Sequence, residues 1–403
     1  MTKAKRYCAE LFKYKRARTA ILIPITLLAV LLAMQFPNLT EAVYSRGIYR
    51  FITETCGRLF GLLPFSVSQF LIVLLVIFPI VLAAYVIREV YVISKLEKAK
   101  ETEKCRAREI RFTASMICLI SAAIFLLGFA GETMNGARVP FAQTYDFEAG
   151  EVSASELSEL CEELIDEINE YAAFVSRDDD GLMVISAESY YELAKQVQDA
   201  YLAVAEEYET LGGFTPIVKP VLYSSLMSRL GFAGLLVPYT LEAHVNVDMP
   251  QYEIPVTMAH EIAHFKGYVL EDEANFIALL ACMAGTDAEA GTDAEAGTNA
   301  EAGTDADLKY SALMEALHFA GNRLHEVDCP GYHELLGKLS DDVWADYRAF
   351  VEYWTQIKGS EPQFTEDNTE LLLYRIYHSD GAHGYGEGMV ELLISYYRER
   401  LAR

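Results

Sequence analysis

The sequence predicts a mainly helical protein, with three N-terminal transmembrane helices followed by an extracytoplasmic α+β domain that contains a small sheet. Three observations predict this fold class. The first third of the 403-residue chain holds three long apolar runs, the remainder shows the apolar spacing of amphipathic helices, and one stretch rich in β-branched and aromatic residues interrupts these helices. A chain of this length is expected to form two or three domains.

The three apolar runs cover residues 20–36, 65–87 and 112–130, each long enough or nearly long enough to cross a bilayer. Seven Lys and Arg residues precede the first run and eight lie between the second and the third, but only three lie between the first and the second. Because basic residues gather on the cytoplasmic side, we expect a multi-pass protein of the cytoplasmic membrane with its N-terminus inside. Residues 1–130 then form a membrane domain and residues 131–403 an extracytoplasmic domain.

The two expected domains differ strongly in charge. Residues 1–130 hold 18 basic and 8 acidic residues, whereas the remainder holds 15 and 50. A strongly acidic C-terminal part argues against nucleic acid as a partner and favours a solvated body outside the membrane.

The seven cysteines give no disulfide framework. Only Cys161, Cys282 and Cys329 fall within residues 131–403, and three thiols cannot all pair. Cys282 closes an apolar helical run, where a buried thiol is expected. We assign none of the cysteines a role in disulfide or metal bonding.

The helices of the C-terminal part are predicted from caps and apolar spacing. Ser153 and Glu156 form a capping box that opens the first helix, and Ser340 caps a later one. One or two short strands are predicted within residues 231–247. The predicted helices cover residues 153–175, 187–211, 256–266, a segment starting near 270, 308–327, 341–357 and 388–401.

Residues 284–307 form a repeat of four six-residue units: AGTDAE, AGTDAE, AGTNAE and AGTDAD. The unit is small and acidic and has no large apolar side chain, so it cannot bury a core. We expect a disordered insert whose deletion leaves the domain intact; a structured metal-binding repeat is the alternative.

The strongest functional motif begins at His260. His260, Glu261 and His264 form an H-E-x-x-H pattern. On a helix, positions i and i+4 share a face, so the two imidazoles are expected to bind one Zn²⁺ ion. Zinc lowers the pKa of a water molecule to near neutrality, and Glu261, one residue past the first ligand, stands where a general base is needed. A coincidental amphipathic helix is the alternative.

The Gly- and His-rich stretch near the C-terminus offers further catalytic candidates. Its glycines allow close backbone approach, so His378, His383 and Tyr385 are candidate donors to the oxyanion that forms during hydrolysis. A capped loop before a helix is the alternative for each.

The predicted strand segment offers candidate substrate-binding residues. Glu242, His244 and Asn246 are expected to line an edge strand that holds an extended peptide. His244 as an ordinary surface residue is the alternative.

The motif extends into a longer signature, H-E-x-A-H-x-x-G-x-x-x-E-x-E-A-N-F, from His260 to Phe276. With it, the chain resembles the bacterial membrane-protein family catalogued as "domain of unknown function 3810", in which N-terminal transmembrane helices precede a domain with this signature. The resemblance spans most of residues 130–403, and the repeat at 284–307 departs from the family pattern. Three further stretches share the likeness: VPYTLEAHVN (237–246), LKYSALMEAL (308–317) and GYGEGMVELLISYYR (384–398).

The same residues are similar to zinc metallopeptidases of the gluzincin type, which combine H-E-x-x-H with a later E-x-x-x-N step. This likeness implies a zincin-like domain, with Glu271 as the third zinc ligand. Asn275, one turn further on, is then expected to steady a ligand from behind. Glu273 is the rival third ligand, but on a helix it points about 200° away from Glu271.

Two classes of function remain open. The motif favours a membrane-anchored zinc metallopeptidase that hydrolyses peptide bonds of a peptide or protein substrate outside the cytoplasmic membrane. The alternative is a non-catalytic membrane sensor or envelope-assembly protein with a structural zinc site, and a weaker variant of the enzyme acts on another envelope bond. Glu261 favours the enzyme, because a purely structural site has no use for that carboxylate.

Overall fold

The structure is a computed structural model, and it describes part of the chain. The described residues are 30–61, 63–74, 133–147, 152–284, 299–358 and 387–402, with the single residues 28, 77, 80, 81, 84, 87, 88 and 150. They belong to two compact units. The smaller unit comprises Met1–Tyr49, Ser66–Arg138 and Pro238–Thr240, and the larger comprises Arg50–Phe65, Val139–Val237 and Leu241–Arg403.

In the smaller unit, helix α3 (Pro37–Leu39) leads into the π-helix η1 (Thr40–Tyr49). A buried ion pair stabilises this unit: Arg138 Nη2 lies 2.8 Å from Glu41 Oε1. A second bond joins neighbouring residues of the same two segments: the Ser45 hydroxyl donates to Asn135 Oδ1 at 3.0 Å.

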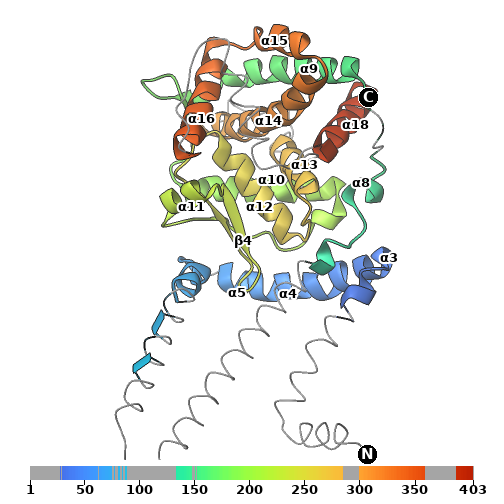
Figure 1. Cartoon of the computed structure of the whole chain (residues 1–403), viewed down its shortest axis with the longest axis vertical. Coiled ribbons are helices and arrows are strands. Elements are labelled where there is room, and N and C mark those ends of the chain that lie inside the picture. Colours follow the sequence, from blue (N-terminus) through green and yellow to red (C-terminus); the bar gives the residue numbers. More distant parts are fainter. Residues whose placement is uncertain are drawn as a thin grey trace, which may run out of the picture. The chain divides into compact units, whose positions relative to one another are not determined.

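The larger unit is mainly helical (Figure 1). It starts with a run of short helices that alternate between α and π geometry: α4 (Arg50–Ile52), η2 (Thr53–Gly57) and α5 (Arg58–Gly61). Its other helices are α8 (Phe141–Thr144), α9 (Ala154–Ala172), α10 (Tyr190–Glu207), η3 (Glu209–Leu211), α11 (Ser224–Leu230), α12 (Glu253–Phe265), α13 (Glu271–Ala284), α14 (Asn299–Val327), α15 (Cys329–Leu336), α16 (Asp341–Lys358) and α18 (Glu387–Ala402).

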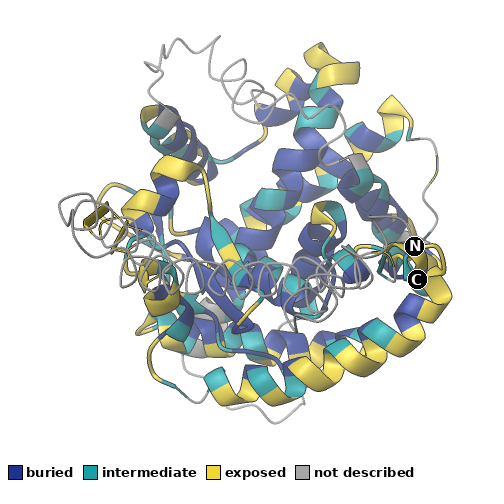
Figure 2. Ribbon diagram, turned by 60° about the horizontal axis from the view of Figure 1, so that its bottom comes forward, coloured by how far each residue is buried: buried dark blue, intermediate teal, exposed yellow. Residues whose placement is uncertain are grey.

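Helices α12 and α13 lie at the centre of this unit. They pack on each other, α10 packs on α13, and α14 packs on both α12 and α13 and on α9. Buried residues cover most of α12 and α13, whereas the surface helices are buried along one face and exposed along the other (Figure 2). This burial follows the apolar spacing, since α9 turns Leu157, Leu164 and Ile168 into the core.

Two small sheets accompany the helices. Strands β1 (Ser176–Arg177) and β2 (Met183–Val184) form an antiparallel pair. The second sheet has the order β3-β5-β4, with β3 (Lys219–Pro220) parallel to β5 (Glu242–Val245) and β4 (Gly234–Val237) antiparallel to it. Strand β5 is therefore central, and β4 forms an edge that lies against α12.

The prediction of three transmembrane helices is wrong for the described residues, which contain no helix both long and apolar enough to cross a membrane. A crossing helix needs about 20 mostly apolar residues, whereas a long helix such as α9 carries acidic side chains along its length. The fold class is corrected to a mainly helical protein with two small sheets, and the multi-pass localisation that followed from the spans is wrong with them. Run 112–130 and parts of runs 20–36 and 65–87 lie outside the described residues.

The capping box predicted at Ser153 and Glu156 is confirmed, and the predicted C-terminal helices correspond to α14, α16 and α18. The predicted disorder of the repeat does not hold for its last nine residues, 299–307. Helix α14 begins at Asn299, within the third repeat unit, and the last residue of the repeat, Asp307, is fully buried. The backbone N–H of Ser186 donates to the Asp307 carboxylate at 2.6 Å, which offsets part of the cost of burying this group.

Candidate metal centre

The turn between α12 and α13 brings together the three residues expected to bind metal. His260 and His264 lie one turn apart on α12, and Glu271 opens α13. Between the helices, Gly267 adopts a left-handed backbone conformation with φ of 88°, which favours glycine. The chain reverses tightly there, since the N–H groups of Gly267 and Tyr268 donate to the carbonyls of His264 and Ala263.

The donor atoms of these residues converge. His260 Nε2 lies 3.2 Å from Glu271 Oε2, and His264 Nε2 lies 3.7 Å from Glu271 Oε1. One donor atom from each residue falls within 4.8 Å of the other two. Nitrogen and oxygen ligands of a tetrahedral zinc ion stand about 3.4 Å apart, so the observed separations fit one ion.

Hydrogen bonding leaves the correct nitrogen of His264 for a metal. Its Nδ1 lies 2.7 Å from the carbonyl oxygen of Tyr268, so Nδ1 carries the proton and Nε2 keeps its lone pair. Burial lowers the pKa of His264 to about 4, with help from the charge of His260 and against the effect of Glu271. His264 is therefore neutral at pH 7, the state in which imidazole binds metal.

His260 is held by two neighbours. Burial lowers its pKa, but a hydrogen bond to Glu271 and the nearby charge of Glu261 outweigh burial and raise the pKa overall. Asn275, buried on α13, also makes a side-chain hydrogen bond to His260. Burial raises the pKa of Glu271, but the hydrogen bond to His260 and the charges of His260 and His264 outweigh burial and lower the pKa overall, so this side chain is a carboxylate at neutral pH.

Glu261 lies beside this cluster but does not join it. Its side chain is buried, and within the part of the chain that the structure describes its Oε2 atom has no hydrogen-bond partner. Burial raises the pKa of Glu261 to about 8. The charge of His260 opposes this shift, and the charge of Glu271 adds to it. A buried carboxylate that lacks a protein partner is costly unless a ligand or water satisfies it. This orphaned atom and the imidazole–carboxylate donor set both fit a zinc ion with its water.

Strand β4 confines the Glu261 carboxylate through a glycine. A Cβ atom on Gly234 would stand 2.2 Å from Glu261 Oε1 and 2.7 Å from its carboxyl carbon. Only glycine lets the strand approach this closely. Sequence reasoning missed Gly234, although a single glycine within a strand pattern is a known sign of close backbone approach.

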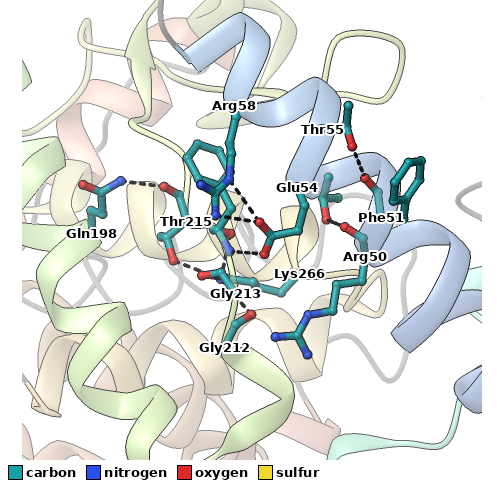
Figure 3. Close-up of polar contacts among 12 residues, drawn as sticks. Arg50, Phe51, Glu54, Thr55, Arg58, Gln198, Gly212, Gly213, Thr215 and Lys266 are labelled. Carbon is teal, nitrogen blue, oxygen red and sulfur yellow. Dashed lines mark hydrogen bonds and ion pairs between the residues drawn. The ribbon is translucent and has the colours of Figure 1, made fainter.

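The C-terminal end of α12 is anchored by Lys266. Its half-buried ammonium donates to the Phe214 carbonyl and to the Thr215 hydroxyl, each at 2.9 Å, and reaches the Gly213 carbonyl at 3.4 Å (Figure 3). In the same close-up, Glu54 of η2 accepts the Phe214 N–H at 2.7 Å. These bonds hold the C-terminal end of α12 at Lys266, two residues beyond His264. They thereby fix the helix that carries both histidines.

Glu273, the rival third ligand, serves a different purpose. Its buried Oε1 accepts the backbone N–H of Phe141 at 2.5 Å, where α8 begins. The carboxylate is directed away from the histidines, in agreement with its position on the helix relative to Glu271.

The strand residues expected to bind substrate are buried and have partners in the protein. Glu242 accepts from Lys219 Nζ at 2.8 Å, His244 Nδ1 lies 3.3 Å from the Leu235 carbonyl, and Asn246 Nδ2 donates to Ser228 Oγ at 2.9 Å. The expected edge strand is in fact the central strand β5, because β3 and β4 pair with it on both sides. His378, His383 and Tyr385 lie outside the described residues.

Comparison with known proteins gives one match. A model of the family described as "Protein of unknown function (DUF3810)" matches residues 44–394. The match includes α12, α13 and strand β4, and so covers all the residues of the candidate centre. No curated protein and no solved structure matches the chain.

Proposed function

The chain belongs to the DUF3810 family of proteins of unknown function, and from that premise we propose that it is a zinc metallopeptidase of the gluzincin type. His260, His264 and Glu271 would hold the ion. Zinc bound there supplies Lewis acidity, which polarises a carbonyl group and lowers the pKa of a water molecule. The observation that carries the proposal is Glu261: a buried carboxylate next to the ligands, with a free oxygen atom and no place among the donors.

Glu261 would act as general base and then as general acid. It takes a proton from the attacking water, and the same carboxyl group then gives a proton to the leaving amine. Gly234 supports this role by leaving room for the carboxylate directly beside strand β4.

A peptide is the substrate that the surroundings favour. Strand β4 is at the edge of its sheet, and it passes directly over the Glu261 carboxylate. An extended peptide can add to such an edge through backbone hydrogen bonds, which would place a peptide bond next to the base. Glu271 is about half exposed, with 49% of its side chain accessible, so solvent and substrate reach the donors.

Glu261→Gln tests the proposal in the purified full-length protein. We expect hydrolysis of a mixed fluorogenic peptide library to fall by about 10² to 10⁴, because the base is lost. Zinc content and melting temperature should stay at wild-type values, since glutamine has the same shape and no metal ligand is changed. Glu159→Gln, on an exposed part of α9, is the matched control and should hydrolyse the library at the wild-type rate.

Two results would overturn the proposal. One is a Glu261→Gln protein that retains the wild-type rate. The other is a wild-type protein that holds stoichiometric zinc and shows no chelator-sensitive hydrolysis, which would leave a structural zinc site as the better description.

A further inference from the structure

A second group of potential metal ligands lies at the junction of α14 and α15. Cys329 Sγ lies 3.5 Å from His325 Nε2 and 3.3 Å from His333 Nε2. One donor atom from each of the three residues lies within 4.8 Å of the other two. The two imidazole rings are nearly parallel, with an angle of 20° between their planes.

The spacing of these residues explains why they meet. They stand at positions i, i+4 and i+8, which share one face of a helix. The helix is interrupted between the first and second, because α14 ends at Val327 and Asp328 leaves helical geometry with φ of −145° and ψ of 74°. Asp328 then caps α15 by accepting the Gly331 N–H at 3.1 Å, so the three side chains stay on one side of a fixed turn.

Packing beneath the turn fixes α15 against α14. Tyr332 is buried, its hydroxyl lies 3.2 Å from that of Tyr347, and its ring packs on Gly321 of α14, where a Cβ atom would stand only 2.9 Å from the ring. The edge of this ring also meets the His325 ring, with centroids 5.4 Å apart. The scaffold of the three donors is thus set by the fold before any ligand arrives.

We infer that His325, Cys329 and His333 form a second zinc site. Sulfur at about 2.3 Å and nitrogen at about 2.05 Å from a tetrahedral zinc ion stand about 3.6 Å apart, close to the two observed separations. Thiolate and imidazole are ligands that zinc prefers over magnesium or calcium. Cys329 and His333 are exposed, which gives an ion direct access from solvent and leaves a fourth position for water.

This inference does not depend on the proposed peptidase. The two clusters share no residue, and only the second contains sulfur. From the sequence, Cys329 was expected to take part in neither disulfide nor metal bonding. In the structure, a helix break at Asp328 combines this cysteine with two histidines.

Cobalt titration of the metal-depleted full-length protein separates the two sites. Cobalt replaces zinc, and a cobalt–thiolate bond gives a near-ultraviolet charge-transfer band that nitrogen and oxygen ligands do not give. We expect this band to appear with one equivalent of cobalt and to disappear in Cys329→Ser, together with one equivalent of bound ion. Zinc should displace cobalt and abolish the band.

Three variants serve as controls. Cys56→Ser changes another accessible thiol and should keep the band. His264→Ala should keep the band while removing the ion of the first site, and His333→Ala should weaken or remove the band while Cys329 is still present.

A band that persists in Cys329→Ser, or wild-type protein that gives no band at all, would overturn the inference and leave Cys329 hydrogen-bonded between two imidazoles. A protein that shows the band but binds no second ion would uphold this site while removing the metal basis of the proposed peptidase.

Discussion

Two helix junctions of the larger unit place three donor residues around one point, and they do so in different surroundings. At the α12–α13 turn two histidines share a helix and the carboxylate follows a left-handed glycine, with a buried, non-ligating Glu261 beside them. At the α14–α15 turn a thiol lies between two histidines, and two of the three residues are exposed.

The contrast explains why we propose catalysis at one junction and ion binding alone at the other. Both junctions supply ligand geometry, because helical spacing and a turn between two helices together bring three donors to one point. Among the described residues, only the first junction also has beside it a buried carboxylate with an oxygen that lacks a hydrogen-bond partner, and a sheet edge. Chemistry is therefore proposed for the first junction alone.

The largest effect is expected from the isosteric pair Glu271→Gln and Glu273→Gln. Glu271→Gln removes the negative charge of a proposed ligand and should weaken zinc binding at the first junction by more than about 10²-fold. Loss of a residue that only orients a ligand costs about 10- to 100-fold, so the effect should be larger than that. Glu273→Gln keeps an acceptor for the Phe141 N–H and should leave zinc affinity unchanged. Competition with a zinc chelator measures both; an equal loss in the two variants would end the distinction between them.

Gly234→Ala tests whether the sheet edge belongs to the first junction. The added methyl group cannot fit at 2.2 Å from Glu261 Oε1, so the carboxylate must move. We expect kcat/KM for peptide hydrolysis to fall by about 10²-fold, the effect of misplacing a reacting group by about 1 Å, with zinc content unchanged. Gly150→Ala, where a Cβ atom meets nothing within 4 Å, is the matched control. Undiminished hydrolysis in Gly234→Ala would separate β4 from the site.

Asp307→Asn probes the helix that connects the two junctions, because α14 packs on α12 and α13 and carries His325 in its last turn. Burial raises the pKa of Asp307 to about 6, against hydrogen bonds from Ser186. The protonated carboxyl group therefore stabilises the folded chain at low pH, and this stabilisation is lost as the pH rises from about 4 through about 6.

Across that window, the free energy of unfolding of the wild type should fall relative to Asp307→Asn by about 2 to 3 kcal/mol, the value of a shift of about two pKa units. Urea unfolding at several pH values measures the difference. Parallel curves for the two proteins would show that the end of the repeat contributes no buried acid.

The smallest effect is expected from Asn275→Ala. This change removes the hydrogen bond to His260 but no ligand, so zinc affinity at the first junction should fall by about tenfold. The cobalt–thiolate band of the second junction should stay as in the wild type. A change in that band would mean that the two junctions are not independent.

Local patterns in the sequence were sufficient where contacts are local. The i, i+4 histidines and the capping box at Ser153 each depend on neighbours within a few residues, and the structure has both. Glu271 was expected beside the histidines from the likeness to gluzincin peptidases, and the short turn at Gly267 brings its carboxylate to them.

Prediction was wrong or incomplete where burial depends on distant segments. The repeat has no large apolar residue, yet Asp307 is buried, and Ser186, far away in sequence, donates to it. Strand β5 is central because β3 and β4 come from both sides of α11, an order that alternation of side chains does not reveal. Apolar runs near the N-terminus predicted membrane spans, but the part of the chain that the structure describes contains no helix both long and apolar enough to cross a membrane.

The anchoring of Lys266 has a consequence for how the site assembles. The C-terminal end of α12 and the first turn of α13 are fixed by partners 51 and 132 residues away, through Lys266 with Thr215 and Glu273 with Phe141. Contacts of such long range form late and slowly, because the intervening chain must close first. A peptide cut from residues 253–284 would contain every ligand of the first junction, yet lack the partners that orient them. We therefore expect the candidate centre to form late in folding. A nascent chain should bind an ion there only after α12 and α13 have come together with Phe141 and Thr215.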